Sequence, residues 1–243
     1  MPTRLERGMV RSMTDLAGAS VLVAGATGGL GAPISRQLAA AGALLTITGR
    51  DADRLAALGL GAVAVPADLR RAGAADAVVQ RAVDAHGRLD GVVFAAGAVA
   101  FAPATETPDQ VLVDLFTLNT LAPIRLLRAA LPHLQASAAD GREPFVVHIS
   151  AVVAETPMPG MAAYSATKAA LAGFDQAAVR ELRRSRIRLV DARPPHTETG
   201  LADRPMFGTA PGLPTGLDPD TVARRIMTAI TAGETDLPSS AFA

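Results

Sequence analysis

Cysteine and tryptophan are absent from the 243 residues, and tyrosine occurs only once. Without cysteine the chain has no disulfide framework and no thiolate metal ligand, and its four histidines are scattered without ligand spacing. No apolar run approaches the ~18 residues of a membrane span. The formal net charge is zero and no predicted helix concentrates Lys or Arg, which argues against nucleic acid and anionic membrane as partners. The N-terminal segment lacks the apolar core of a signal peptide, so we expect a cytoplasmic protein.

The length and composition fit one α/β domain. A chain of 243 residues that is 49% hydrophobic and 19% charged can bury a single sizeable core. We find no internal repeat and no second domain. We therefore expect residues 1–17 to form a flexible extension and residues 18–243 to form the domain.

Lysine and asparagine also occur once each, as Lys168 and Asn119, and the single tyrosine is Tyr164. Residues four apart share one face of a helix, so Tyr164 and Lys168 are neighbours there. An ammonium beside a phenol favours the phenolate, which lowers the pKa and makes tyrosine a usable proton donor and acceptor. The alternative is a pair on a helix surface with no chemical role. For Asn119, inside a predicted helix, the alternatives are a solvent-facing side chain and a buried polar anchor.

A glycine-rich turn lies near the N-terminus, between an apolar run at residues 20–24 and an amphipathic helix pattern. A second apolar run at residues 44–48 follows, so the order is strand, turn, helix, strand. Such a turn lets the backbone approach a pyrophosphate and points free N–H groups at it. The alternative is a tight corner without a ligand. The setting favours dinucleotide binding, with these candidate residues: Gly25, Thr27, Gly28, Gly29, Leu30 and Gly31.

The end of the second strand indicates which dinucleotide binds. An acidic residue there would bind a ribose 2′-hydroxyl, whereas the arginine found there, Arg50, suits a 2′-phosphate. We therefore predict NADP(H) rather than NAD(H), the alternative being a surface arginine beside the helix cap Asp51. After the third strand, Asp68 could accept from the adenine amino group or cap the next helix.

The rest of the chain alternates strands and helices. Further strands are predicted at residues 62–65, 90–94, 145–149 and 187–190, with a long helix over about 109–134 and a last helix to about residue 232. Residues 234–238 form at most a stub strand. This alternation specifies a doubly wound, Rossmann-type parallel sheet with helices on both faces. The Pro- and Gly-rich residues 195–217 are predicted to form a flexible flap over the substrate.

These motifs together resemble the short-chain dehydrogenase/reductase family, of the ~250-residue single-domain type. The resemblance extends over residues 19–236. It rests on the run 24–31 (AGATGGLG), Asp68-Leu69, the run 95–97 (AAG), Asn119, the run 164–168 (YSATK), and Pro194 with Thr199. It implies NAD(P)H-dependent carbonyl reduction or alcohol oxidation.

The resemblance also implies roles for single residues. Tyr164 is the acid/base, Lys168 binds the nicotinamide ribose and lowers the pKa of the tyrosine, and Asn119 holds a water that passes the proton to solvent. Thr199 contacts the nicotinamide carboxamide. The further cofactor-binding residues are Leu69, Ala96, Gly97, Pro194 and Thr197, together with Tyr164 and Lys168 themselves.

The chain departs from the family pattern at three positions. Ala95 replaces an asparagine that braces the sheet, and Pro195 replaces a glycine at the start of the flap. The family's catalytic serine precedes the tyrosine by thirteen residues, and that position is Ala151. Ser150 lies one residue early and would point to the opposite face of a regular strand. We predict that a bulge turns Ser150 inward as the carbonyl donor, with Ala151 and a slow enzyme as the alternative.

Two functions remain open at this point. The first is an NADP(H)-dependent reductase of a ketone or aldehyde, with a small, apolar substrate suggested by the flap residues Met206 and Phe207. The second is a dinucleotide-binding protein with feeble turnover that acts as a redox sensor or scaffold. Small-residue faces on the helices of Asn119 and Tyr164 predict a homodimer or homotetramer. These faces consist of Ala129, Ala130, Ala169, Ala170, Ala177 and Ala178.

Overall fold

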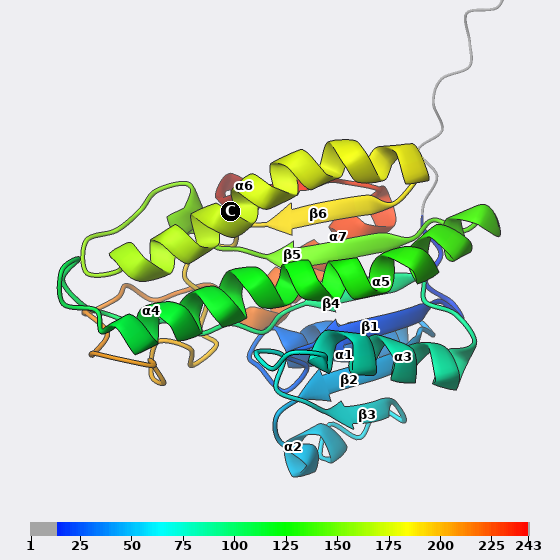
Figure 1. The fold of residues 1–243 in the computed structure, drawn as a ribbon, viewed down its shortest axis with the longest axis horizontal. Coiled ribbons are helices and arrows are strands. Elements are labelled where there is room, and N and C mark those ends of the chain that lie inside the picture. The colour runs from blue at the N-terminus through cyan, green and yellow to red at the C-terminus, as the bar shows by residue number, and fades with distance from the viewer. Residues whose placement is uncertain (1–13, 243) are drawn as a thin grey trace, which may run out of the picture.

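A single parallel sheet of seven strands organises the computed structural model, which describes residues 14–242. The strand order is β3-β2-β1-β4-β5-β6-β7, and every neighbouring pair is parallel (Figure 1). The strands are β1 Ser20–Ala24, β2 Leu44–Gly49, β3 Val63–Pro66, β4 Gly91–Phe94, β5 Phe145–Ile149, β6 Arg188–Ala192 and β7 Asp236–Leu237. The doubly wound α/β fold expected from the sequence is confirmed.

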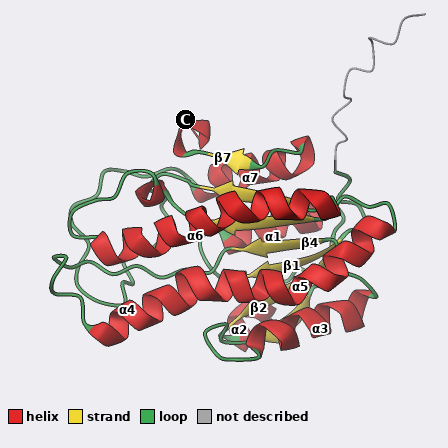
Figure 2. Cartoon of the chain, turned by 45° about the horizontal axis from the view of Figure 1, so that its top comes forward, coloured by secondary structure: helices red, strands yellow, loops and turns green. Residues whose placement is uncertain are grey.

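Helices cover both faces of the sheet (Figure 2). One buried cluster joins α1 and α7 to one face, and a second joins α3, α5 and α6 to the other. The helices are α1 Gly31–Ala40, α2 Ala52–Ala56, α3 Ala74–His86, α4 Asp109–Phe116, α5 Ala122–Ala139, α6 Ala162–Leu182 and α7 Pro219–Ala232.

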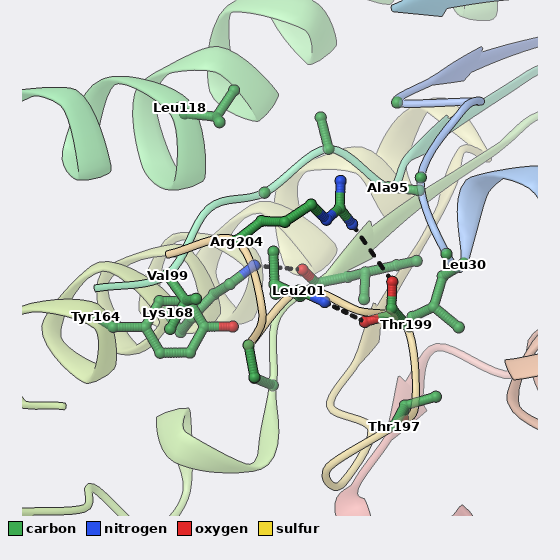
Figure 3. Close-up of a pocket in the computed structure, with 18 of the residues that line it drawn as sticks. Leu30, Ala95, Val99, Leu118, Tyr164, Lys168, Thr197, Thr199, Leu201 and Arg204 are labelled. Atoms are coloured by element: carbon green, nitrogen blue, oxygen red, sulfur yellow. Dashed lines mark hydrogen bonds between the residues drawn. The ribbon is translucent and has the colours of Figure 1, made fainter. Parts of the chain in front are cut away.

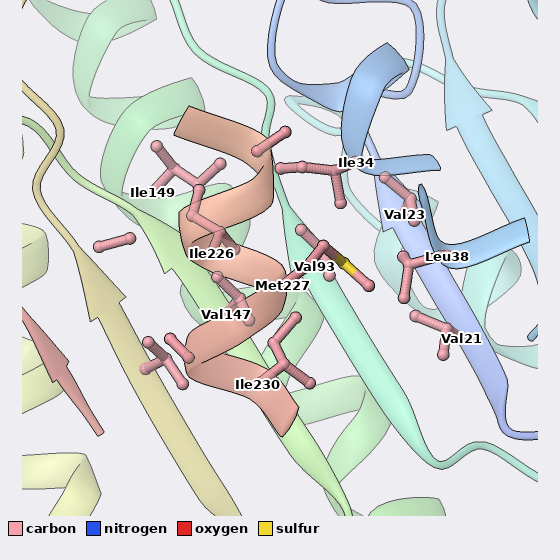
Figure 4. Close-up of a cluster of buried hydrophobic side chains, with 14 of the residues drawn as sticks. Val21, Val23, Ile34, Leu38, Val93, Val147, Ile149, Ile226, Met227 and Ile230 are labelled. Atoms are coloured by element: carbon pink, nitrogen blue, oxygen red, sulfur yellow. The ribbon is translucent and has the colours of Figure 1, made fainter. Parts of the chain in front are cut away.

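Side-chain periodicity explains how the layers pack. Every residue of β1 and β5 is buried, as expected for parallel strands that are covered on both faces. On α7, Val222, Ile226 and Ile230 recur every four residues and form one buried apolar stripe. Figure 4 shows this helix lying against the strands that carry Val93 and Val147. The core is thus two apolar layers, one on each side of the sheet.

The long helix predicted over residues 109–134 is longer than expected and is not a regular α-helix throughout. α4 passes through a π-helical turn, Thr117–Leu121, into α5, which ends at Ala139. By length and composition alone, Asp109–Ala139 is the one helix in the described part of the chain that could cross a membrane. Helices that cover the core of a soluble protein meet the same criterion, and one face of α5 packs on the sheet.

The extension and the flap predicted from sequence are tied to the domain where the structure describes them. Residues 1–13 lie outside the described part, but the Thr14 N–H donates to the Thr231 carbonyl at 3.1 Å and Leu16 is buried. In the flap, the Met206 N–H donates to the Val99 carbonyl at 2.7 Å, and the Phe101 N–H donates to the Phe207 carbonyl at 2.9 Å. These bonds fix the flap over the loop that follows β4.

The strand order also places the site. β1 is flanked by β2 on one side and β4 on the other, so the chain reverses its winding direction between β1 and β4. In open parallel sheets a crevice forms outside the carboxyl ends of the strands at this point. The carboxyl ends of β1, β2, β4, β5 and β6 are therefore where ligands are expected.

Candidate active site

A cavity of about 320 Å³ lies at this crevice, bounded by the glycine-rich turn, the strand ends, α6 and the flap. Figure 3 shows Tyr164, Lys168, Thr199 and Arg204 around it. Most of the predicted site residues line it: Gly25, Thr27, Gly28, Gly29, Leu30, Arg50, Asp68, Leu69, Ala96, Gly97, Ser150, Tyr164, Lys168, Pro194, Thr197 and Thr199. The two that do not, Gly31 and Asn119, support the cavity from behind.

The glycine-rich turn requires glycine at specific positions. Gly25 has φ +79°, and a Cβ there would lie 2.5 Å from the Ala96 nitrogen, so no other residue fits without movement of the backbone. A Cβ at Gly31 would overlap the Gly25 carbonyl oxygen. The turn is thus folded tightly back on itself, which sets α1 directly above the end of β1.

The N-terminus of α1 is suited to an anion. No side chain caps the helix, and the described residues supply no acceptor for the N–H groups of Gly29 and Leu30. Free N–H groups and the helix dipole together attract phosphate groups. The cradle therefore fits the pyrophosphate of a dinucleotide, as the sequence predicts.

Arginines surround the end of β2. Arg50 and Arg54 both line the cavity, and neither forms an ion pair among residues 14–242. The Arg54 guanidinium donates to the Thr27 carbonyl at 2.8 Å, whereas Asp51 caps α2 by accepting from the Arg54 N–H at 3.0 Å. Arg54, which was not predicted from the sequence, lies in α2, three residues after the cap Asp51.

Asp68 lies in the cavity as predicted, but its carboxylate already has a partner. Arg70 Nε donates to Asp68 Oδ1 at 3.0 Å and Arg70 Nη2 donates to Oδ2 at 2.7 Å. These bonds hold the pKa of Asp68 below its ordinary value. Arg70 was also not predicted from the sequence. It bonds to the carboxylate oxygens of Asp68 that were predicted to accept from the adenine amino group.

Tyr164 and Lys168 meet in the cavity wall, one turn apart on α6. The Lys168 Nζ lies 5.9 Å from the centroid of the Tyr164 ring and donates to the Ile149 carbonyl at 2.8 Å. Both side chains are buried, so burial raises the pKa of Tyr164 and lowers the pKa of Lys168 to about 8. The structure does not show the lowered tyrosine pKa that the sequence predicts, because burial dominates and the ammonium donates to a backbone carbonyl.

Asn119 is a buried polar anchor, the second of its two predicted alternatives. Its Oδ1 accepts from the Ala98 N–H at 3.0 Å, and its Nδ2 donates to the Ala98 carbonyl at 2.9 Å and to Thr167 Oγ1 at 3.1 Å. A Cβ at Gly97 would lie 3.5 Å from Asn119 Oδ1 and 3.7 Å from Lys168 Nζ. Asn119 thus joins the loop after β4 to α6 directly behind the Tyr164–Lys168 pair.

Ser150 does not adopt the arrangement predicted for it. The sheet continues without a bulge, because the Ser150 N–H donates to the Ala192 carbonyl at 2.8 Å. The Ser150 hydroxyl donates to Asp191 Oδ1, on the face of the sheet under α6. Ala151 instead packs in the small cluster around Tyr164. The alternation of a regular strand explains both directions.

The flap closes over the glycine-rich turn. A Cβ at Gly29 would overlap Thr199, so the two segments touch through their backbones. The Thr197 hydroxyl donates to the Pro195 carbonyl at 2.9 Å, and the Leu201 N–H donates to the Thr199 hydroxyl at 3.4 Å (Figure 3). These contacts hold the predicted residues Thr197 and Thr199 at the mouth of the cavity.

Comparisons with known proteins agree with this geometry. Residues 19–205 match the family model described as short chain dehydrogenase. An uncharacterized oxidoreductase of Methylorubrum extorquens is 33% identical over 77% of this chain and 76% of its own. A hydroxynaphthalene reductase of Aspergillus fumigatus is 31% identical over 93% of this chain and 82% of its own.

Solved structures show the same fold. A 3-ketoacyl-(acyl-carrier-protein) reductase from Brucella melitensis, complexed with NADH, superposes with a TM-score of 0.83 at 25% identity, covering 92% of this chain and 97% of its own. A short chain dehydrogenase from Burkholderia cenocepacia, in complex with NADP, gives 0.81 at 27% identity, covering 95% and 100%. With the Tyr164–Lys168 pair, Asn119 and the glycine-rich turn in one cavity, the chain belongs to the short-chain dehydrogenase/reductase family of oxidoreductases.

Proposed function

We propose that the protein uses NADP(H) to interconvert a small, apolar carbonyl compound and the corresponding alcohol. The observation that carries the proposal is the buried Tyr164–Lys168 pair in the same cavity as the uncapped N-terminus of α1. Reduction of a carbonyl needs a hydride, which a bound dinucleotide supplies, and a proton, which a phenol can supply. A cavity that holds both groups side by side is suited to this reaction.

The chain's own residues supply the proton and the alignment. When bound, the nicotinamide supplies or accepts the hydride. The Tyr164 phenol, whose pKa burial raises, is protonated at neutral pH, so it can donate to the oxygen of a carbonyl as negative charge develops there. The Lys168 ammonium, held at the Ile149 carbonyl, favours the phenolate that remains. Asn119 fixes the loop and helix that align the pair.

The arginines at the end of β2 support the preference for NADP(H). Arg50 and Arg54 bring two positive charges to the cavity beside the end of β2, where we expect the 2′-substituent of a bound dinucleotide. Asp51, the acidic residue that follows Arg50, uses its Oδ1 to cap α2. Charge-assisted bonds from guanidinium to phosphate are about twice as strong as neutral ones.

The substrate class follows from the wall beside Tyr164. Val99, Phe101, Val153 and Met161 form a buried apolar cluster with the tyrosine ring, and Leu201 of the flap packs against it. A pocket with this lining and a single proton donor selects an apolar molecule that carries one carbonyl or hydroxyl group.

A second candidate, a catalytically weak dinucleotide-binding sensor or scaffold, is favoured by one observation. Ala151 replaces the serine of the family pattern, and the neighbouring Ser150 hydroxyl is bonded to Asp191. A missing donor to the carbonyl oxygen costs ~10²-fold or more in turnover. The intact Tyr164, Lys168 and Asn119 favour the first candidate.

Assembly as a homodimer or homotetramer also remains a proposal. On α6, Ala169, Ala170 and Ala177 are exposed and open to close packing by a symmetry mate. Ala130 and Ala178, which the small-residue pattern also suggested, are buried inside the subunit and cannot contribute. Light scattering at micromolar concentration tests this, and a monomer would rule it out.

Steady-state turnover tests the proposed function. Purified protein is incubated with NADPH and a panel of small ketones and aldehydes of increasing apolar size, and absorbance of NADPH is followed. We expect saturable consumption with at least one apolar carbonyl. Tight NADPH binding without consumption across the panel would favour the sensor or scaffold, and absence of binding would contradict both candidates.

A further inference from the structure

Ionisable side chains lie buried beneath the active-site lysine, between the sheet and α6. His148 of β5 and Asp191 of β6 are paired in the strand register and face the same side as Ser150. Asp175 lies on α6, seven residues after Lys168 and therefore on the same side of the helix. His148, Asp175 and Asp191 are at most 4% exposed. We call these three residues the buried ionic layer.

Asp191 is the member of this layer with both oxygens fixed. Oδ1 accepts from the Ser150 hydroxyl and Oδ2 accepts from Arg193 Nη1. Arg193 continues outward, with Nε donating to Glu155 at 2.6 Å and Nη2 donating to Asp236 at 2.6 Å. Although burial opposes it, bonds with Glu155 and Asp236 raise the pKa of Arg193. The guanidinium is therefore a permanent positive charge that holds the carboxylate in place.

The buried Lys168 ammonium forms no ion pair among the described residues. Its only hydrogen-bond acceptor among the described residues is the uncharged carbonyl of Ile149, at 2.8 Å. Ile149 is the last residue of β5, and Ser150, which follows it, is bonded to Asp191 of β6, so Lys168 reaches the same end of these two paired strands. Burial lowers the pKa of Lys168, and Asp191 and then Asp175 oppose that effect. The charged or titratable groups around it are thus Asp191 and Arg193 from β6 and its end, Asp175 and Tyr164 from α6, and His148 from β5.

Asp175 is the weaker source of that negative charge. Its Oδ1 lies 2.7 Å from His148 Nδ1, while its Oδ2 has no hydrogen-bond partner among the described residues. Burial raises the pKa of Asp175, because the charged carboxylate loses its hydration and no donor to Oδ2 replaces it. Asp191, which has two donors, is therefore the fixed carboxylate of the layer.

We propose that the Asp191 carboxylate is the positioning charge that keeps the Lys168 ammonium protonated beside Tyr164. Ser150 and Arg193 fix the orientation of this carboxylate. The proposal deepens the proposed function, on which its catalytic consequence rests. It also gives Ser150 a role, because its hydroxyl serves Asp191 instead of the substrate carbonyl.

The single lysine of the chain makes a direct test possible. Protein labelled only with ¹⁵Nζ-lysine gives one side-chain signal, whose titration reports the protonation of Lys168 without any turnover. We expect a midpoint near pH 8 in the wild type. In Asp191→Asn the loss of the negative charge should move it to about pH 7 or below. An unchanged midpoint in a folded Asp191→Asn protein would overturn the proposal.

Two further variants complete the design. Asp90→Asn is the matched control, because Asp90 is equally buried and bonded to Ser137 and Arg88 but lies at the amino end of β4. It should leave the lysine midpoint unchanged, and an equal shift would show a general effect of instability. Ser150→Ala keeps every charge but removes the donor to Asp191 Oδ1, so the carboxylate is held less firmly and the midpoint should fall, by less than in Asp191→Asn. This variant tests the proposal even if Asp191→Asn fails to fold, and an unchanged or raised midpoint would contradict it.

The catalytic consequence is tested by the pH profile of NADPH oxidation. Because neutral lysine no longer favours the phenolate, the alkaline fall in rate should begin at lower pH in Asp191→Asn, by the same interval as the titration midpoint. A shifted midpoint in protein that never oxidises NADPH would contradict the proposed function and leave the role of Asp191 standing. A shifted midpoint with an unshifted rate profile would limit that role to the charge of the lysine.

Discussion

The two halves of the cavity are built in different ways. The cofactor half, residues 25–31 with the end of β2, depends on backbone: glycines that admit no Cβ and N–H groups left free at the start of α1. The catalytic half, the ends of β5 and β6 with α6, depends on buried side chains that bond to one another. The first half needs local geometry, and the second needs a network assembled from distant segments.

This difference explains where each half tolerates change. A turn made of backbone fails when a side chain is added, because nothing next to it can move. A buried ionic network fails when one charge is removed, because its partners remain buried without compensation. Substitutions in the cofactor half should therefore change the affinity for NADPH, whereas substitutions in the catalytic half should change the rate of hydride transfer.

Tyr164→Phe should have the largest effect on the catalytic half. Removing the phenol hydroxyl removes the proton donor, so turnover should fall by about 10³-fold. NADPH affinity, measured by fluorescence titration, should stay within about threefold of the wild type, because the ring and its neighbours remain. Turnover that survives this substitution would place the proton donor elsewhere.

Ala151→Ser tests whether the catalytic half lacks a carbonyl donor. A serine hydroxyl beside Tyr164 would bond to the developing oxyanion, so single-turnover hydride transfer should accelerate by up to about 10²-fold. If Ser150 is nevertheless the donor, as the sequence predicted, Ser150→Ala should be crippling and Ala151→Ser should be neutral. The two variants measured side by side decide between these outcomes.

Arg50→Ala addresses the cofactor half. Loss of one charge-assisted bond to a 2′-phosphate should weaken NADPH binding by about tenfold and leave NADH binding unchanged. Calorimetric titration of both cofactors measures this. Arg180→Ala is a suitable control, because Arg180 is an exposed arginine on α6 that is not among the residues lining the cavity. Equal losses for NADPH and NADH in Arg50→Ala would contradict the assignment.

The smallest expected effect is the pH dependence of the wild type. Burial lowers the pKa of Lys168 to about 8. The ammonium is therefore fully charged at pH 6, and its charge is lost as the pH rises through about 8. The rate of hydride transfer at saturating NADPH should therefore fall to about half of its pH 6 value near pH 8. A rate that stays level to pH 10 would show that the lysine charge is not required.

The sequence predicted the cofactor half more completely than the catalytic half. The glycine turn and the strands were predictable because apolar runs and glycine spacing are local signals. Asp191 and Asp175 gave no such signal, because their partners, Ser150 and His148, are separated from them by 41 and 27 residues. The π-helical turn at Asn119 was also missed, because a single asparagine in a helix pattern does not indicate how the backbone accommodates it.

Ser150 shows most clearly why the remainder could not be predicted. From its position relative to Tyr164, the Ser150 hydroxyl could point either into the cavity or to the opposite face of the sheet. The direction depends on whether that opposite face offers a hydrogen-bond acceptor. Asp191 provides an acceptor there, and a regular strand reaches it without a bulge. Side-chain pairing across strands therefore decided a question that spacing along the chain left open.

The central claim, that this cavity transfers a hydride between NADPH and an apolar carbonyl compound, is tested most directly by a single-turnover isotope measurement. Wild-type protein in excess over NADPH is mixed with a saturating apolar ketone in a stopped-flow instrument, using protiated cofactor and cofactor deuterated at the transferred position. The account predicts a single exponential loss of NADPH absorbance that is slower with deuterium. Bound NADPH that stays reduced with every apolar carbonyl tried would contradict it.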